Sequence, residues 1–201
     1  MEMNEKELSP QESLALIQTM INKTKGSVAD DSFHFLLWGW LVFVCCLASY
    51  VLKVYVHYPN HFIVWCSMPV AGVISGIYGA RQNRQKKVKS FLDEALDYLW
   101  IAIALSFVVL VIINMLNGAA WQTAFTYYIL LYAIGTFVSG SLLQFKPLII
   151  GGLINFVLAA VSARLNYDNQ LLLGSVAILI SYIIPGHLLR MKYQKQKNNP
   201  W

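Results

Sequence analysis

The residues that could carry acid–base chemistry are few, and most lie outside the apolar parts of the chain. The 201 residues include ten Asp and Glu, and after Asp97 the only acidic residue is Asp168. General acid–base catalysis needs titratable groups held in position, and no long apolar stretch contains a carboxylate in its interior. The sequence also lacks the phosphate-loop, His-Glu-x-x-His and Gly-x-Ser-x-Gly patterns. We therefore expect no catalytic residue and a protein that is not an enzyme.

The histidines and cysteines do not form a recognisable metal-binding pattern. His57 and His61 are four residues apart, but Pro59 lies between them and no Cys, Asp or Glu is close by in the sequence. The three cysteines are Cys45, Cys46 and Cys66, all within apolar stretches, where a free thiol packs like a small hydrophobic group. We expect reduced cysteines, no metal site and no cofactor.

One amide side chain stands out, because Asn155 falls near the middle of an apolar stretch. An amide in a hydrocarbon environment is costly unless it is hydrogen-bonded, so Asn155 should face other helices or a cavity. The residues expected to form an intramembrane polar site are Asn155, Thr136, Ser139 and Ser75. Two interpretations stay open: hydrogen bonding between helices, or a site for a ligand or ion.

These polar residues would have to be positioned by membrane-spanning helices. Hydrophobic residues make up 57% of the chain and charged residues 12%, far from the balance of an average soluble domain. Each of six apolar runs has about the length that a helix needs to cross a bilayer. We expect an all-α, polytopic membrane helical bundle over residues 33–190, with spans at about 33–52, 62–80, 99–116, 119–143, 147–163 and 171–189.

The basic residues predict the orientation of these spans. With six spans, all of the 15 Lys and Arg except Lys53 and Arg164 fall on the side that holds the N-terminus. Under the positive-inside rule, both termini should then lie in the cytoplasm. The net charge of +5 does not indicate nucleic acid, because the Lys and Arg flank apolar runs instead of forming a basic domain. The expected location is the cytoplasmic (inner) membrane, with the lipid bilayer as the main partner.

Small residues within the spans predict close helix packing. Gly72 and Gly76 form a Gly-x-x-x-Gly pair, with Gly79 on a neighbouring ridge, and Gly151 shares a face with Asn155. Small residues let transmembrane helices approach closely, either within one chain or between copies in a homo-oligomer. Pro69 and Pro185 would each break or kink a span.

Two regions outside the spans could contact cytoplasmic partners. Residues 1–32 contain an expected amphipathic helix over residues 9–25, which could bind a protein partner, the membrane surface or the protein's own loops. The segment 81–97 should form a helix that enters the third span without a break. Its basic residues set the topology, and they could also bind anionic lipid headgroups: Arg81, Arg84, Lys86, Lys87 and Lys89. Residues 191–201 form a basic tail.

The stretch from Glu12 to Lys25 (ESLALIQTMINKTK), followed by Asp31 to Phe43 (DSFHFLLWGWLVF), resembles the opening of a family of bacterial six-span integral membrane proteins of unknown activity. The resemblance extends over residues 12–54. It implies a multi-pass membrane protein and carries no functional residue with it.

The leading functional expectation is a non-enzymatic membrane protein that acts through contacts, as a scaffold, a sensor or an accessory subunit. The alternative is a small-molecule transporter, or the substrate-binding membrane subunit of one. In that case Asn155, Thr136 and Ser139, together with Tyr127, Tyr128 and Tyr132, would line an uncharged cavity.

Overall fold

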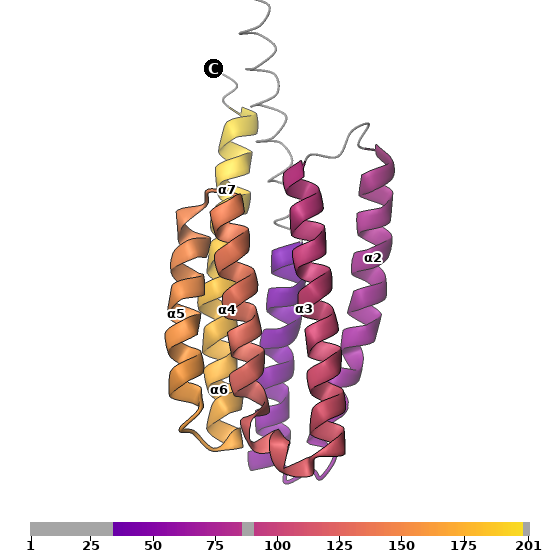
Figure 1. Cartoon of the computed structure of the whole chain (residues 1–201), viewed down its shortest axis with the longest axis vertical. Coiled ribbons are helices and arrows are strands. Elements are labelled where there is room, and N and C mark those ends of the chain that lie inside the picture. Colours follow the sequence, from indigo (N-terminus) through magenta and orange to yellow (C-terminus); the bar gives the residue numbers. More distant parts are fainter. Residues whose placement is uncertain (1–33, 86–90, 199–201) are drawn as a thin grey trace, which may run out of the picture.

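The computed structural model describes residues 34–85 and 91–198, and over these ranges the protein is all-helical with no strand (Figure 1). The expected all-α class is therefore confirmed for the described part of the chain. The amphipathic helix expected at residues 9–25, the basic residues Lys86, Lys87 and Lys89, and the end of the basic tail lie outside the described residues.

The helices fall on the six apolar runs. By length and composition five are suited to crossing a membrane, and a shorter apolar helix, α5, has 17 residues. In chain order the first elements are the helix His34–Val54 (called helix 34–54), η1 (His61–Cys66) leading into α2 (Ser67–Gln85), and α3 (Phe91–Leu116). They are followed by η2 (Gly118–Thr123), which leads into α4 (Ala124–Leu142), and by α5 (Lys146–Ser162). The last long helix is α6 (Tyr167–Ile178), which continues through η3 (Leu179–Ile183) into α7 (Ile184–Asn198).

The two prolines expected to distort spans each lie next to a change of helix type. Pro69 is the third residue of α2, which continues directly from the 3₁₀ segment η1, so this span changes its hydrogen-bonding pattern just before the proline. Pro185 follows the π-helical segment η3, so the last long helix also changes its hydrogen-bonding pattern there. Helix α3 starts at Phe91 and runs unbroken to Leu116, so the expected continuous entry into the third span is seen from Phe91 onward. Residues 81–85 belong instead to the end of α2.

Helices α4 and α5 pack closely because glycine lies at their points of contact. A Cβ atom added at Gly140 would lie 2.7 Å from the backbone nitrogen of Ile149, and one at Gly152 would lie 2.7 Å from the backbone of Phe137. The Phe137 and Phe156 rings then stack edge to face, with centroids 6.2 Å apart. Lipid tails are as apolar as leucine, so this close van der Waals packing is the main source of helix association in a membrane.

Glycine also joins the first described helix to the last one. A Cβ atom at Gly39 would lie 3.0 Å from Cβ of Tyr182, and one at Gly186 would lie 3.0 Å from the side chain of Leu36. On the other side, Gly135 of α4 receives the ring of Trp100 from α3. Helix 34–54 and helices α4 to α7 therefore form the tightly packed part of the bundle.

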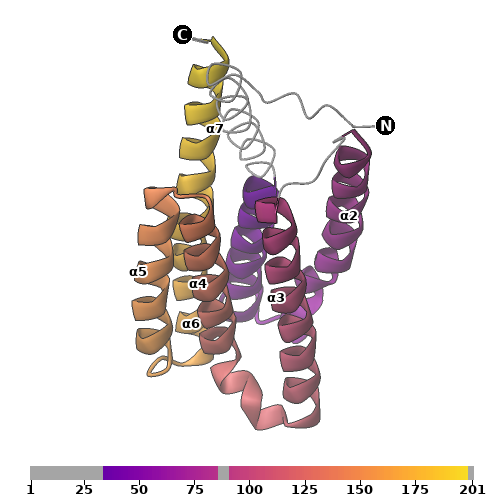
Figure 2. The same ribbon diagram turned by 45° about the horizontal axis from the view of Figure 1, so that its top comes forward.

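Helix α2 lies at the edge of the bundle, on the side away from α5 (Figures 1 and 2). Only 6% of its most apolar stretch is buried, against 56% for the stretch within Tyr167–Met191. Its described contacts go mainly to helix 34–54. Hydrogen bonds link Ser75 to His34 and to Trp38.

Charged side chains separate to the two ends of the helices. Arg81, Lys146 and Arg190 are exposed near the end where α2 and α4 finish and where α5 begins. Lys53 and Asp168 lie at the opposite end and form an ion pair. The middle of the bundle, between these ends, carries the uncharged polar residues.

A pair of glycine substitutions tests which contacts hold the bundle together. Gly152→Ala should lower the free energy of unfolding by about 1–3 kcal/mol, because its Cβ meets the backbone of Phe137. Gly72→Ala is the matched control, since a Cβ there meets nothing within 4 Å, and it should be neutral or slightly stabilising. Thermal unfolding of both variants in detergent measures the difference. Equal melting temperatures would contradict this packing.

Candidate functional site

Asn155 lies fully buried within the α4–α5–η3 part of the bundle. Its exposed fraction is 0%, and among the described residues neither Nδ2 nor Oδ1 of its amide has a hydrogen-bond partner. Gly151 and Gly152, on the preceding turn of α5, hold this helix against Ser181 and Phe137. Asn155 is therefore placed between α4 and η3 by the same glycine contacts that exclude lipid from it.

Two of the residues predicted to accompany Asn155 lie on the facing helix. Thr136 and Ser139 of α4 are each 0% exposed. The Thr136 hydroxyl donates to the Tyr132 carbonyl in the preceding turn, whereas the Ser139 hydroxyl has no partner among the described residues. Helical side chains lean toward the N-terminus of their own helix. Because α4 and α5 are antiparallel, with Gly140 opposite Ile149, Ser139 and Asn155 lean toward each other along the helix axes.

Ser75 does not belong to this polar site. Its hydroxyl lies 2.9 Å from Nδ1 of His34 and 3.4 Å from Nε1 of Trp38, so it joins α2 to helix 34–54. Its position within an apolar run predicted that Ser75 lies among the helices of the bundle. It could not predict which neighbouring helix the serine faces.

The tyrosines expected to line a cavity beside Asn155 point to different places. Tyr127 lines a shallow apolar groove between α3 and α4. Tyr128 receives a hydrogen bond of 3.2 Å from the amide of Asn114. Tyr132 packs against Tyr182 with ring centroids 5.2 Å apart. A single tyrosine-lined cavity is therefore wrong for this arrangement.

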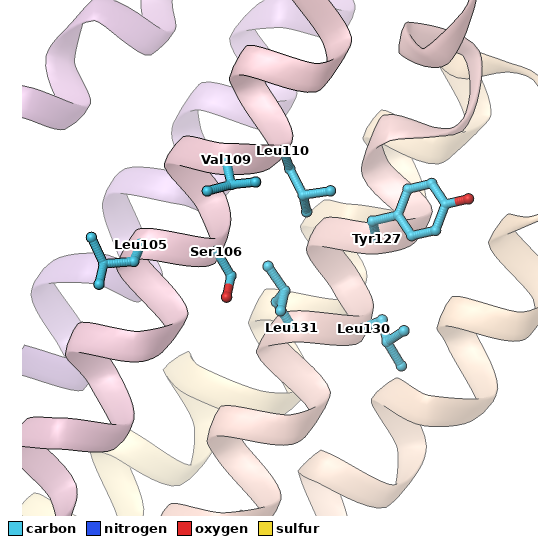
Figure 3. Close-up of a pocket in the computed structure, with 7 residues that line it drawn as sticks. All are labelled: Leu105, Ser106, Val109, Leu110, Tyr127, Leu130 and Leu131. Carbon is cyan, nitrogen blue, oxygen red and sulfur yellow. The ribbon is translucent and has the colours of Figure 1, made fainter.

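The α3–α4 groove is an outward-facing surface (Figure 3). Ser106 is a polar residue in its lining, and its hydroxyl already donates to the Ala102 carbonyl. The groove suits an apolar chain better than a polar solute. Its lining residues are Leu105, Ser106, Val109, Leu110, Tyr127, Leu130 and Leu131.

The predicted packing glycines divide into two groups. Gly151 packs closely against η3, because a Cβ atom there would lie 3.0 Å from Cα of Ser181. A Cβ at Gly72, Gly76 or Gly79 would meet nothing within 4 Å. Packing of the α2 glycines against other described residues is therefore wrong. The glycine ridge of α2, defined as Gly72 and Gly76, faces away from the bundle, and Gly79 lies on the neighbouring ridge that carries Ser75.

The basic residues predicted to bind lipid headgroups are described only in part. Arg81 is exposed near the end of α2. Arg84 lies in the last turn of the same helix, and its side chain is outside the described atoms. The exposed position of Arg81 beyond the apolar part of α2 is compatible with contact to a charged surface.

A cluster at the opposite end was missed in the sequence. Lys53 forms an ion pair with Asp168, and both side chains are about one-third exposed, at 33% and 35%. The Lys53 ammonium also lies 4.2 Å from the centroid of the Tyr167 ring, and His61 packs edge to face on the same ring at 6.0 Å. The signal was available, because Asp168 is the only acid after Asp97 and Lys53 is one of two cations predicted for that end.

Gln170 anchors the loops around this ion pair. It is 0% exposed, and its Nε2 donates to the carbonyls of Gln122 (2.8 Å) and Leu165 (2.9 Å). Asn166 caps the same helix by accepting from the Asn169 N–H. One amide thus fixes η2 and the α5–α6 connection to the start of α6.

The chemistry available to these sites is binding by uncharged polar groups. Within residues 34–85 and 91–198, no group of three or more His, Cys, Asp and Glu is arranged to hold a metal ion. The Cys45 thiol lies 3.4 Å from the hydroxyl of Ser67, and the three cysteines are free. The arrangement offers hydrogen-bond donors and acceptors in the bundle interior and one ion pair at its end.

Comparisons with protein-family models, with curated proteins and with solved structures find no match to this chain.

Removing the Gln170 amide tests its anchoring role. Gln170→Leu leaves the carbonyls of Gln122 and Leu165 without this donor, which should lower the free energy of unfolding by roughly 1–3 kcal/mol. Asn169→Ala, at the exposed neighbouring position, is the control and should have little effect. Thermal unfolding in detergent provides the measurement. A Gln170→Leu variant as stable as the control would show that these bonds contribute little.

Proposed function

We propose that the chain is a non-enzymatic, multi-pass integral membrane protein that works by associating with another transmembrane helix through the glycine ridge of α2. In this role it is a scaffold or accessory subunit of the cytoplasmic membrane. The observation that carries the proposal is a contrast between two groups of glycines. One group packs tightly against another helix, and the other, on α2, has no close neighbour among the described residues.

The tightly packed helices use glycine as a contact residue throughout. At Gly39, Gly135, Gly140, Gly151 and Gly152, a Cβ atom would come within 3.0 Å of another element. The glycine ridge of α2 has the same small-residue spacing but meets nothing within 4 Å. Because glycine weakens a helix relative to alanine, two such positions on one exposed ridge are best explained by a contact with a helix outside this chain.

The position of the ridge on α2 leaves it accessible. Ser75 and Tyr78 face helix 34–54 through their contacts with His34. The glycine ridge is rotated away from these residues around the helix, next to exposed Val73. A partner helix can therefore pack on the ridge without displacing helix 34–54.

Six crossings with both termini in the cytoplasm form part of the proposal. Five helices have sufficient length and apolar character, and α5 spans about 26 Å at 1.5 Å per residue. The exposed Lys146 at its start can extend its side chain to the headgroup level, which offsets a short span. The separation of charges between the two ends supports this orientation.

A topology experiment tests the six crossings. A reporter active only in the cytoplasm should be active when inserted between Arg84 and Lys89 and when fused after Trp201. The same reporter placed at Asn60 should be inactive, because that loop lies at the opposite end of the helices. Activity on different sides for the first two positions would contradict an even number of crossings.

Substitution of the ridge tests the association. Gly76→Leu should abolish co-purification of the partner from native membranes, because the longer side chain blocks close helix approach. Ile77→Phe adds bulk to another exposed face of α2 and should leave co-purification intact. Both variants should retain the thermal stability of the parent protein. If nothing co-purifies with the parent protein, or if both variants behave alike, the ridge is not a contact surface.

The transporter alternative is favoured by a different observation, the buried amide of Asn155 without a protein partner. A substrate-binding role would place a small uncharged solute among Asn155, Ser139 and Thr136. Thermal stabilisation by a panel of neutral metabolites would support it, since a ligand that binds only the folded state raises apparent stability.

A further inference from the structure

The break between α6 and α7 leaves one backbone carbonyl without its helical donors. In η3 the N–H of Ile184 bonds to the carbonyl of Leu179, one residue further back than in an α-helix. Pro185 has no N–H. The carbonyl of Ile180 would take its hydrogen bond from residue 184 in an α-helix or from residue 185 in a π-helix. Both donors are therefore lost.

This carbonyl is directed at α5. A Cβ atom at Gly151 would lie 3.1 Å from the Ile180 oxygen and 3.0 Å from Cα of Ser181. Glycine at position 151 allows this approach, and a larger residue would cover the oxygen. An acceptor oxygen thus lies against the face of α5 that carries Asn155 one turn later.

Asn155 and Ser139 bring further hydrogen-bonding groups to the same region. The Asn155 side chain leans toward Gly151 because helical side chains lean toward the N-terminus. Its amide provides two donors and an acceptor, and the Ser139 hydroxyl provides one donor and acceptor sites. Both side chains are 0% exposed and have no protein partner among the described residues.

We propose that Asn155, Ser139 and the Ile180 carbonyl form an internal binding site for ordered water at the helix break. The groups are uncharged and include both donors and acceptors, which water can satisfy together. A divalent cation would require carboxylate ligands, and an apolar molecule would leave the amide unpaired. Broken membrane helices are tolerated where water and neighbouring side chains satisfy the freed backbone groups. The site is independent of the glycine ridge of α2.

Radiolytic hydroxyl-radical footprinting of the full-length protein tests the site, because radicals formed from a bound water label adjacent side chains that bulk solvent does not reach. Tyr182 of η3 is 2% exposed, its ring packs against Tyr132 one turn before Thr136, and its hydroxyl has no hydrogen-bond partner among the described residues. It should be labelled in the parent protein despite this burial. Asn155→Leu should reduce the labelling several-fold, and Gly151→Ala should do the same by covering the carbonyl.

Asn114→Leu is the matched control. It removes another buried amide, bonded to Tyr128 between α3 and α4, and should leave Tyr182 labelling unchanged. Absence of Tyr182 labelling in the parent protein would overturn the proposal even if the variants do not fold. Labelling that survives Asn155→Leu would also overturn it.

A second measurement separates water from a cation. A melting temperature that rises in NaCl but not in choline chloride, and that loses this dependence in Asn155→Ala, would assign the site to a cation instead.

Discussion

Close approach of helix backbones at glycine residues is the constraint on which the rest of the bundle depends. In lipid the hydrophobic effect does not drive helices together, so van der Waals contact has to do so. Gly140 and Gly152 bring α4 onto α5, and Gly39 brings helix 34–54 onto η3. The same closeness buries Asn155 and Ser139 where lipid cannot reach and where few protein groups can bond to them.

The elements of the fold could be predicted from the sequence because their signal is local. The length and composition of each apolar run predict a helix. In the last long helix, Pro185 marks the place where the hydrogen-bonding pattern changes. The arrangement of the helices could not be predicted in the same way. Glycine in α2 and glycine in α5 look alike in the sequence, yet the first group faces outward and the second faces η3 and α4.

Burial of a polar side chain could be predicted from its position within an apolar run. Which helix that side chain faces could not be predicted, because this depends on the packing of the helices. Asn155 lies at the centre of an apolar run, and its burial follows from the cost of exposing an amide to lipid. Ser75 also lies within an apolar run, but it faces His34 on helix 34–54. The ion pair between Lys53 and Asp168 joins residues far apart in the chain, so only the tertiary structure brings it together.

The contact between the first described helix and the last one has a consequence for biogenesis. Synthesis proceeds from the N-terminus, so helix 34–54 is made long before Tyr182 and Gly186, the residues that pack on it. Until then the face of this helix that carries Gly39 lacks the neighbour it has in the folded bundle. This contact therefore forms only after most of the chain has been made, and a chain that stops short of η3 would leave Gly39 without the residues that pack on it.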